Sequence, residues 1–415
     1  MIINKTLTFI AIKKFTIHLT KNIKQNLATA VLTAVQNTVG NANSLMPLHE
    51  PEFSGHEWDY VKESIETGWV STSGTYVERF ENDLVDITGA QHAIATCNGT
   101  SALHLALILA EVKPEEEVIV PALSFVATAN AVRYCHAIPH FVEISNHDLG
   151  MDSAVLESYL YSITEQTSKG LFNKKTGRRI SAIVPMHTFG HPANLEALLV
   201  LSQKLRLPLI EDAAEALGSF YKGKHCGTFG RIAALSFNGN KLATTGGGGA
   251  LLTNDPSIAK RAKHLSTTAK LPHKWSYVHD EVGYNYRMPN INAALGCAQL
   301  EKLSDWIVEK RKLAEKYDAA FEGIPGLKFV KEPMGAKSNY WLNAITIEDG
   351  KIETRDSILQ ELNNANYMSR PAWALLCDLQ PFINCPRMDD LSTAKYIETS
   401  LINLPSSPKL VRGPV

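Results

Sequence analysis

Short apolar runs alternate with segments of helical spacing over most of this chain. Strands that are buried on both faces read as continuous apolar runs, and seven runs fit that description. Segments between them, such as Ser101 to Ala110 and Asn194 to Leu205, carry helical spacing. The pattern predicts an α/β fold with a mainly parallel seven-stranded sheet covered on both faces. The predicted strands are 93–96, 117–121, 140–144, 181–185, 207–211, 233–236 and 249–252.

The pattern changes near both ends of the chain. Residues 1–45 read as an N-terminal extension, with an amphipathic helix through Leu27, Val31, Leu32 and Val35 that ends near Gly40. Residues 46–305 carry the strand and helix alternation and predict the large domain. The helical stretches 289–303 and 306–321 lead into shorter strand and helix candidates, so residues 306–415 predict a smaller α+β domain.

Composition narrows the class of partner. The 415 residues hold 41 Lys and Arg against 42 Asp and Glu, so no global field attracts nucleic acid or an anionic membrane. The six cysteines form no C-x-x-C pair, which argues against a zinc site and a disulfide framework and favours a reducing cytoplasm. The apolar stretch 7–12 is short and is followed by Lys13 and Lys14 without a convincing cleavage site. We therefore expect a cytoplasmic protein, without membrane insertion, that acts on a small molecule.

The candidate chemistry lies where the predicted strands end, because ligands of open α/β sheets sit beyond the carboxyl ends of the strands. Asp212 closes the fifth strand, and Lys241 follows the sixth. A lysine amine can form a Schiff base with a carbonyl, and a carboxylate can keep the ring nitrogen of pyridoxal phosphate protonated. Lys241 and Asp212 fit those two catalytic roles. Asp212 could instead cap a helix beginning at Ala213.

Four further positions at this edge are weaker candidates. Thr100 and Ser101 open a helix, whose N-terminus offers N–H groups to a phosphate, although a plain N-cap explains them too. Phe125 could stack on a pyridine ring or belong to the core. His187 could face the ring or the substrate, or be a structural histidine.

Residues 246–249 are four successive glycines, a run that packing does not explain. Such runs occur where the backbone needs unusual angles or a close approach to another group. A nucleotide-binding loop is the competing interpretation. The run lacks the Walker spacing, however, and leads into a strand instead of a helix.

Six ordered segments make the chain resemble the DegT family of pyridoxal phosphate-dependent sugar-nucleotide aminotransferases, over about residues 47–405. That family has the aspartate aminotransferase-like fold, fold type I. The segments are Gly68-Trp69-Val70-Ser71-Thr72-Ser73-Gly74, Asn98-Gly99-Thr100-Ser101-Ala102-Leu103, Pro121-Ala122-Leu123-Ser124-Phe125, Glu211-Asp212-Ala213-Ala214-Glu215, Ser236 to Lys241 with its glycines, and Gly283-Tyr284-Asn285-Tyr286-Arg287-Met288.

The resemblance implies several site residues. Ser236 and Asn285 would reach the cofactor phosphate or nearby substrate groups, with Asn285 supplied by the neighbouring subunit of a homodimer. The sugar-nucleotide side would be lined by Ser71, Thr72, Asn285 and the stretch from Arg370 to Trp373. Glu215 occupies a cofactor-facing position where the family commonly has Gln or His. An ionised carboxylate there would repel the phenolic oxygen, so Glu215 is either protonated or turned toward another partner.

The implied function is transamination of a nucleotide-linked 4-keto-6-deoxy sugar, with L-glutamate as the amino donor, for surface glycans. Residues 172–179, the long N-terminus and residues 47–51 resemble the subgroup that makes 4-amino-4,6-dideoxy sugars of the bacillosamine or legionaminic acid type. The basic cluster 172–179 could grip a diphosphate or be a solvated loop. Related dehydratases carry His at the position of Lys241, which disfavours deoxygenation. Amination at a 3-keto position, and a non-catalytic regulator or partner subunit, stay open as alternatives.

Overall fold

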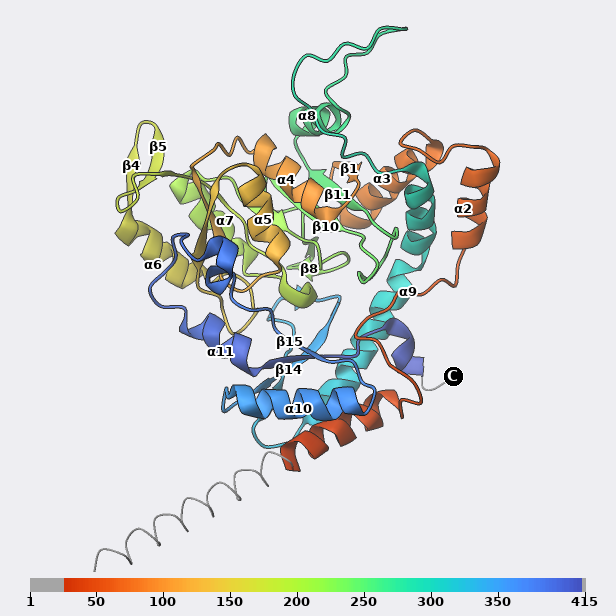
Figure 1. Ribbon diagram of the computed structural model, residues 1–415, viewed down its shortest axis with the longest axis vertical. Helices are drawn as coiled ribbons and strands as arrows, with labels where there is room; N and C mark the ends of the chain where they lie inside the picture. Colours follow the sequence, from red (N-terminus) through yellow and green to blue (C-terminus); the bar gives the residue numbers. More distant parts are fainter. Residues whose placement is uncertain (1–25, 413–415) are drawn as a thin grey trace, which may run out of the picture.

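A mainly parallel sheet of seven strands forms the centre of the large domain in the computed structural model, which describes residues 26–412 (Figure 1). The predicted apolar segment 7–12 lies outside the described residues. Pairing and two parallel bridges, Ile183 with Leu209 and Met186 with Asp212, give a continuous order. That order is β1 (His92–Thr96), β11 (Gly249–Thr253), β10 (Ile232–Ser236), β7 (Ile210–Asp212), β6 (Arg179–Ile183), β2 (Glu117–Pro121) and β3 (Ile138–Val142). The predicted fold class is confirmed.

One strand of this sheet runs against the others. β11 is antiparallel to both β1 and β10, whereas β10–β7, β6–β2 and β2–β3 are parallel pairs. The carboxyl ends of β1, β10, β7, β6 and β2 therefore meet at one edge. This topology brings distant chain segments together at that edge.

Helices cover the sheet, and short polar side chains begin several of them. The Asn98 side chain accepts the Ser101 amide at 2.8 Å and caps α4, which packs on β10 and β11. Asp152, Asn194 and Asp255 cap α6, α7 and α8 in the same way. The helices of this domain are α2 (Glu57–Glu66), α3 (Thr75–Thr88), α4 (Gly99–Leu109), α5 (Val126–Tyr134), α6 (Ser153–Ile163), α7 (Leu195–Leu205), α8 (Pro256–Ser266) and the short η1 (Thr188–Gly190).

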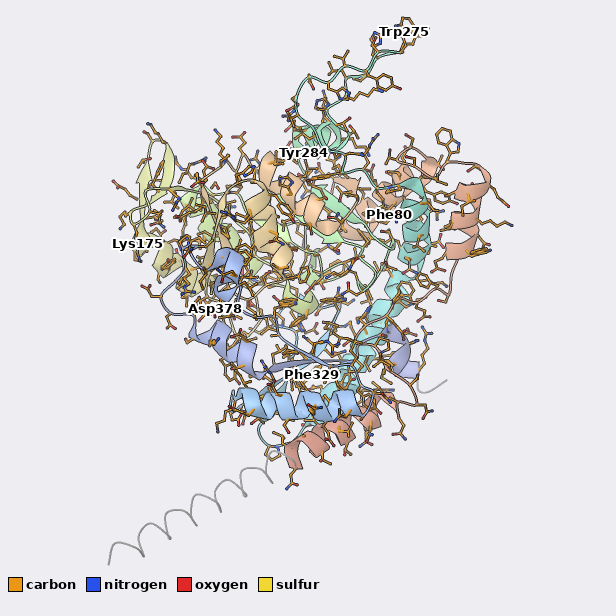
Figure 2. The ribbon with its side chains drawn as sticks, in the orientation of Figure 1. Phe80, Lys175, Trp275, Tyr284, Phe329 and Asp378 are labelled. Atoms are coloured by element: carbon orange, nitrogen blue, oxygen red, sulfur yellow. The ribbon has the colours of Figure 1, made fainter. Side chains whose placement is uncertain are left out.

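A hairpin extends the sheet where the sequence suggested a loop. β4 (Thr164–Thr167) pairs with β5 (Gly170–Asn173), and β5 pairs with the beginning of β6. The basic cluster 172–179 thus belongs to strand ends and to the turn between them. Asn173 is buried and donates to the Glu117 carboxylate at 2.9 Å, which ties the hairpin to the sheet. Lys175 lies at the margin of the molecule (Figure 2).

The small domain contains an antiparallel sheet with α10 (Ile352–Asn364) and α11 (Ser392–Ser400). The strand order is β12 (Leu327–Phe329), β14 (Asn343–Ile347), β16 (Leu401–Leu404) and β15 (Arg370–Pro371). A separate three-stranded sheet joins β8 (Phe220–Tyr221) and β9 (Lys224–His225) to β13 (Ala336–Lys337). The short helices are η2 (Leu376–Asp378), η3 (Gln380–Phe382) and η4 (Pro408–Arg412).

One continuous helix, α9 (Asn290–Phe321), crosses the predicted boundary near residue 305. Its 32 residues correspond to about 48 Å at the usual rise. Ala293 and Leu300 are buried in the large core, while Leu313 and Tyr317 are buried in a second core. Within the extension, residues 26–39 form a helix whose apolar residues join that second core.

An arm leaves the body after α8, over residues 267–288. Trp275 lies at its tip and is 73% exposed (Figure 2). Tyr277 and Val282 are exposed on the same arm. None of the helices within residues 26–412 has the length and apolar character needed to cross a membrane.

Candidate functional site

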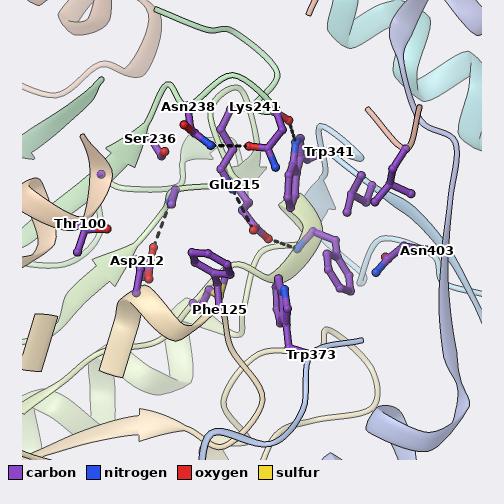
Figure 3. A pocket seen from close by; sticks show the side chains of 18 of the residues that line it. Thr100, Phe125, Asp212, Glu215, Ser236, Asn238, Lys241, Trp341, Trp373 and Asn403 are labelled. Atoms are coloured by element: carbon purple, nitrogen blue, oxygen red, sulfur yellow. Dashed lines mark hydrogen bonds and ion pairs between the residues drawn. The ribbon is translucent and has the colours of Figure 1, made fainter. Parts of the chain in front are cut away.

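A cavity of about 610 Å³ opens at the carboxyl edge of the large sheet, against the small domain (Figure 3). Side chains from both domains line it. The predicted site residues that the fold brings together here are Thr100, Phe125, Asp212, Glu215, Ser236, Lys241, Arg370 and Trp373.

Lys241 projects into this cavity from the turn that follows β10. Its amide donates to the Asn238 carbonyl at 2.9 Å, which fixes the turn. Its Nζ lies 3.1 Å from Glu215 Oε1 and 3.9 Å from the centroid of the Trp341 ring. The indole N–H of Trp341 donates to the Asn240 carbonyl at 2.8 Å. The lysine amine is thus held between a carboxylate and an aromatic face.

Asp212 ends β7 and is almost fully buried. One oxygen accepts the Thr128 hydroxyl at 2.7 Å and the other accepts the Ala214 amide at 3.3 Å. Burial raises the pKa of Asp212, and these two bonds with the charge of Lys241 oppose that shift. Residues 213–219 form turns, so the alternative in which Asp212 caps a helix is wrong. A buried carboxylate in this setting suits a cationic partner.

Two alternatives were open for Glu215: a protonated carboxyl, or a carboxylate turned toward another partner. The structure supports part of each. Its Oε1 accepts from Lys241, and its Oε2 accepts the Phe189 amide at 2.9 Å. Phe189 adopts a positive φ of 56°. Burial raises the pKa of the Glu215 carboxyl, against the lowering effect of Lys241. The side chain therefore faces the lysine and is also easier to protonate than an exposed glutamate.

The first turn of α4 forms another wall. Thr100 lines the cavity beside Ser236, and amides in a first helical turn have no intrahelical acceptor. Close packing places this turn: a Cβ on Gly99 would lie 2.8 Å from Ser236 Cβ, and one on Gly249 would lie 2.4 Å from the Asn98 carbonyl. The last glycine of the run thus permits a close approach, as the sequence indicated.

Five predicted residues are not among the described residues that line this cavity: Ser71, Thr72, Ser101, His187 and Asn285. The Ser101 hydroxyl accepts from Cys97 Sγ at 3.4 Å, and its amide donates to Asn98. Asn285 lies at the base of the arm, where Arg287 donates to its side-chain oxygen at 3.2 Å. Ser71 and Thr72 belong to the loop between α2 and α3.

His187 is fully buried and bonded on both sides of its ring. Nε2 lies 3.1 Å from Glu211 Oε2, and Nδ1 accepts the Ala193 amide at 3.2 Å. Glu211 also accepts three amides from residues 227–230. These contacts match the structural alternative stated for His187 and the stabilisation of a loop by Glu211.

Four further lining residues were not predicted as site residues. Trp341 and Asn403 come from the small domain, and Asn238 and Asn240 flank the lysine turn. The two asparagines belong to the same sequence segment as Lys241, so their proximity to the lysine could have been predicted from the sequence. Trp341 and Asn403 required the packing of the two domains.

The residues present fit pyridoxal phosphate. A lysine amine, a buried carboxylate, a helix N-terminus, the hydroxyl side chains of Thr100 and Ser236, and an aromatic ring line one cavity. They match the aldehyde, the ring nitrogen, the phosphate and the ring face of that cofactor. Together with the sheet order, they define a fold type I pyridoxal phosphate-dependent aminotransferase.

Comparison with known proteins gives the family. The model of the DegT/DnrJ/EryC1/StrS aminotransferase family matches residues 51–415. GDP-perosamine synthase of Escherichia coli O157:H7 is 35% identical over 368 residues, 88% of this chain and 94% of that protein. GDP-perosamine synthase of Caulobacter vibrioides is 34% identical over 367 residues, 88% of this chain and 94% of that protein.

A solved structure agrees. Helicobacter pylori PseC, an aminotransferase involved in the biosynthesis of pseudoaminic acid, superposes with a TM-score of 0.78 at 25% identity, covering 87% of this chain and 94% of that one. The chain belongs to the DegT/DnrJ/EryC1/StrS aminotransferase family and is a pyridoxal phosphate-dependent sugar aminotransferase.

The position of Lys241 predicts where the cofactor is attached. Borohydride reduction of the purified holoprotein should leave the mass of the cofactor on the peptide that contains Lys241. Lys310 is a matched internal control, because it is fully buried but its amine bonds the carbonyls of Trp341 and Ser406. Peptide mass spectrometry reads both sites, and a modified Lys310 with an unmodified Lys241 would contradict the assignment.

The raised pKa of Glu215 predicts a pH-dependent stability. In cofactor-free protein, the folded state binds this proton more tightly than the unfolded state, so stability falls as pH rises from the ordinary carboxyl range through the raised value. Glu215→Gln removes that loss, and its stability relative to wild type should increase with pH across this window. Denaturant unfolding at several pH values measures it. Glu165→Gln, at an exposed glutamate, is the control, and an equal pH trend in both variants contradicts the prediction.

Proposed function

We propose that this aminotransferase moves an amino group from L-glutamate to carbon 4 of a nucleotide-linked 4-keto-6-deoxy sugar. The observation that carries the proposal is the contact of the Lys241 amine with Glu215 and Trp341, inside the cavity that also holds the Asp212 carboxylate. The similarity to two GDP-perosamine synthases supports a nucleotide sugar as acceptor.

The cavity has a polar cofactor side and a mixed substrate side. Thr100 and Asp212 lie on one side, with Trp341, Trp373 and Asn403 on the other (Figure 3). Arg370 supplies a cation on the small-domain wall, which suits a diphosphate. The indole rings of Trp341 and Trp373 suit the methyl group of a 6-deoxy sugar.

Each residue has a separate task. Bound pyridoxal phosphate supplies an electron sink that stabilises negative charge on the reacting carbon. Thr100, Ser236 and the first turn of α4 would hold its phosphate, and Asp212 would keep a proton on its ring nitrogen. Phe125 shields the ring from water.

Proton transfer is the task of Lys241. A protonated amine cannot accept a proton, and the 3.1 Å contact lets Glu215 take one from Lys241 Nζ. Because burial raises the pKa of Glu215, this carboxylate accepts that proton more readily than an exposed glutamate does. The neutral amine is then a base for the substrate carbon.

The transfer is tested in two halves. L-glutamate should convert the yellow cofactor absorbance of the wild type, and a nucleotide-linked 4-keto-6-deoxy sugar should then restore it. UDP-, GDP- and dTDP-linked sugars are compared, and NMR of the product locates the new amine. Lys241→Ala is the inactive control. An amine at carbon 3, or glutamate conversion that none of the sugars reverses, would refute the proposed acceptor.

We further propose that the active unit is a homodimer whose arms complete each other's sites. In support, Asn285 lies at the base of the projecting arm, outside the cavity of its own chain, and Trp275, Tyr277 and Val282 expose apolar surface on this arm. Such surface is typical of an interface.

Complementation between two inactive variants tests the shared site. Co-expressed Lys241→Ala and Asn285→Ala chains form mixed dimers in which one site has both residues intact if Asn285 acts across the interface. Activity should therefore return on mixing, although each variant alone is impaired. If Asn285 acts within its own chain, the mixed dimer contains no intact site and activity stays low. Tagged co-purification confirms that mixed dimers are present.

A further inference from the structure

Residues 26–50 lie outside the segment matched by the family, yet they pack against the small domain. Its helix 26–39 contributes apolar residues to the second core. These residues are Ala28, Val31, Ala34, Val35 and Val39, each 5% exposed or less. They share that core with Leu313 and Tyr317 of α9 and with Ile358 and Leu362 of α10, so the helix is firmly anchored.

After this helix, residues 40–46 form a strap that holds Tyr367. The Tyr367 hydroxyl donates to the Gly40 carbonyl at 2.7 Å and accepts the Ala42 amide at 3.0 Å. The Met46 amide donates to the Asn366 carbonyl at 2.8 Å, and the Met368 amide donates back to Met46 at 3.0 Å. Tyr367 itself is 1% exposed. Four hydrogen bonds therefore join the strap to residues 366–368.

The clamped residues lead directly to the cavity. Arg370 lies three positions after Tyr367, and β15 pairs Arg370 with Asn403 of β16. Both residues line the cavity. The Arg370 guanidinium also donates to Asn363 Oδ1 at 3.2 Å, and Asn363 donates to the Ser369 carbonyl at 3.1 Å. The strap holds one end of this segment and β16 holds the other.

The strap also continues into the cavity wall. Leu48 lines the cavity, and its carbonyl accepts the Ser406 amide at 2.7 Å. Within three positions, the segment 46–48 thus bonds residue 366, residue 368 and Ser406, which lies two residues after β16. Displacement of the strap would move two parts of the same wall together.

We propose that the strap, through Tyr367, is a positioning element that sets Arg370 for the acceptor substrate and takes no part in the exchange with the amino donor. This inference rests on the proposed function, because that function places the nucleotide sugar at Arg370. Lys241, Asp212 and Glu215 lie in the large domain and receive none of the four bonds of the strap. Loss of these bonds should therefore affect acceptor binding selectively.

Tyr367→Phe in the full-length holoenzyme tests the proposal, because it removes the hydroxyl and keeps the ring. Loss of two bonds to a buried group should weaken the binding of nucleoside diphosphate by about tenfold. GDP and UDP are the probes, measured by calorimetry, and the conversion of cofactor absorbance by L-glutamate should stay at the wild-type rate. Hydrogen exchange of residues 366–371 should become faster.

The matched control is Tyr396→Phe, which also removes a small-domain tyrosine hydroxyl, bonded to the Ile347 carbonyl at 3.1 Å. It should leave nucleotide affinity unchanged. Unchanged affinity in Tyr367→Phe, unchanged exchange at 366–371, or an equal loss in the glutamate reaction would overturn the positioning role. Failure of the proposed function looks different: wild type then binds neither nucleotide or does not respond to L-glutamate, and the exchange measurement still decides the role of the strap.

Discussion

The site depends on the cost of burying charge. Asp212 and Glu215 are both nearly inaccessible, and a carboxylate removed from water must find hydrogen bonds or a cation. The surrounding structure meets that requirement with Thr128 and Ala214 for Asp212, and with Phe189 and Lys241 for Glu215. Phe189 adopts a positive φ at the position where its amide donates to Glu215, so this uncommon backbone conformation accompanies the hydrogen bond to the buried carboxylate.

The two domains divide the work. Strand ends of the large domain place the groups proposed to hold the cofactor, and these strands are largely buried. The small domain adds Trp341, Arg370, Trp373 and Asn403, which come from its sheet and the segments beside it. Substrate recognition can therefore vary with the small domain while the chemistry at Lys241 stays the same.

The strands of the large sheet and several residues of the site could be predicted from the sequence for a physical reason. Buried strands appear as apolar runs, and the topology then carries Thr100, Asp212, Ser236 and Lys241 to one edge. Side-chain direction within a motif was less accessible: Ser101 follows Thr100 by one residue but turns to Cys97 and Asn98. Trp341 could not be identified, because its role arises from the contact of two domains that no local pattern records.

The single helix α9 has a consequence for how the molecule unfolds. Its first half completes the large core and its second half completes the small one, without a break between them. If either core unfolded, half of α9 would lose its packing. A half of this helix, isolated in water, is only marginally stable. The two domains are consequently coupled into one cooperative folding unit, despite having separate cores.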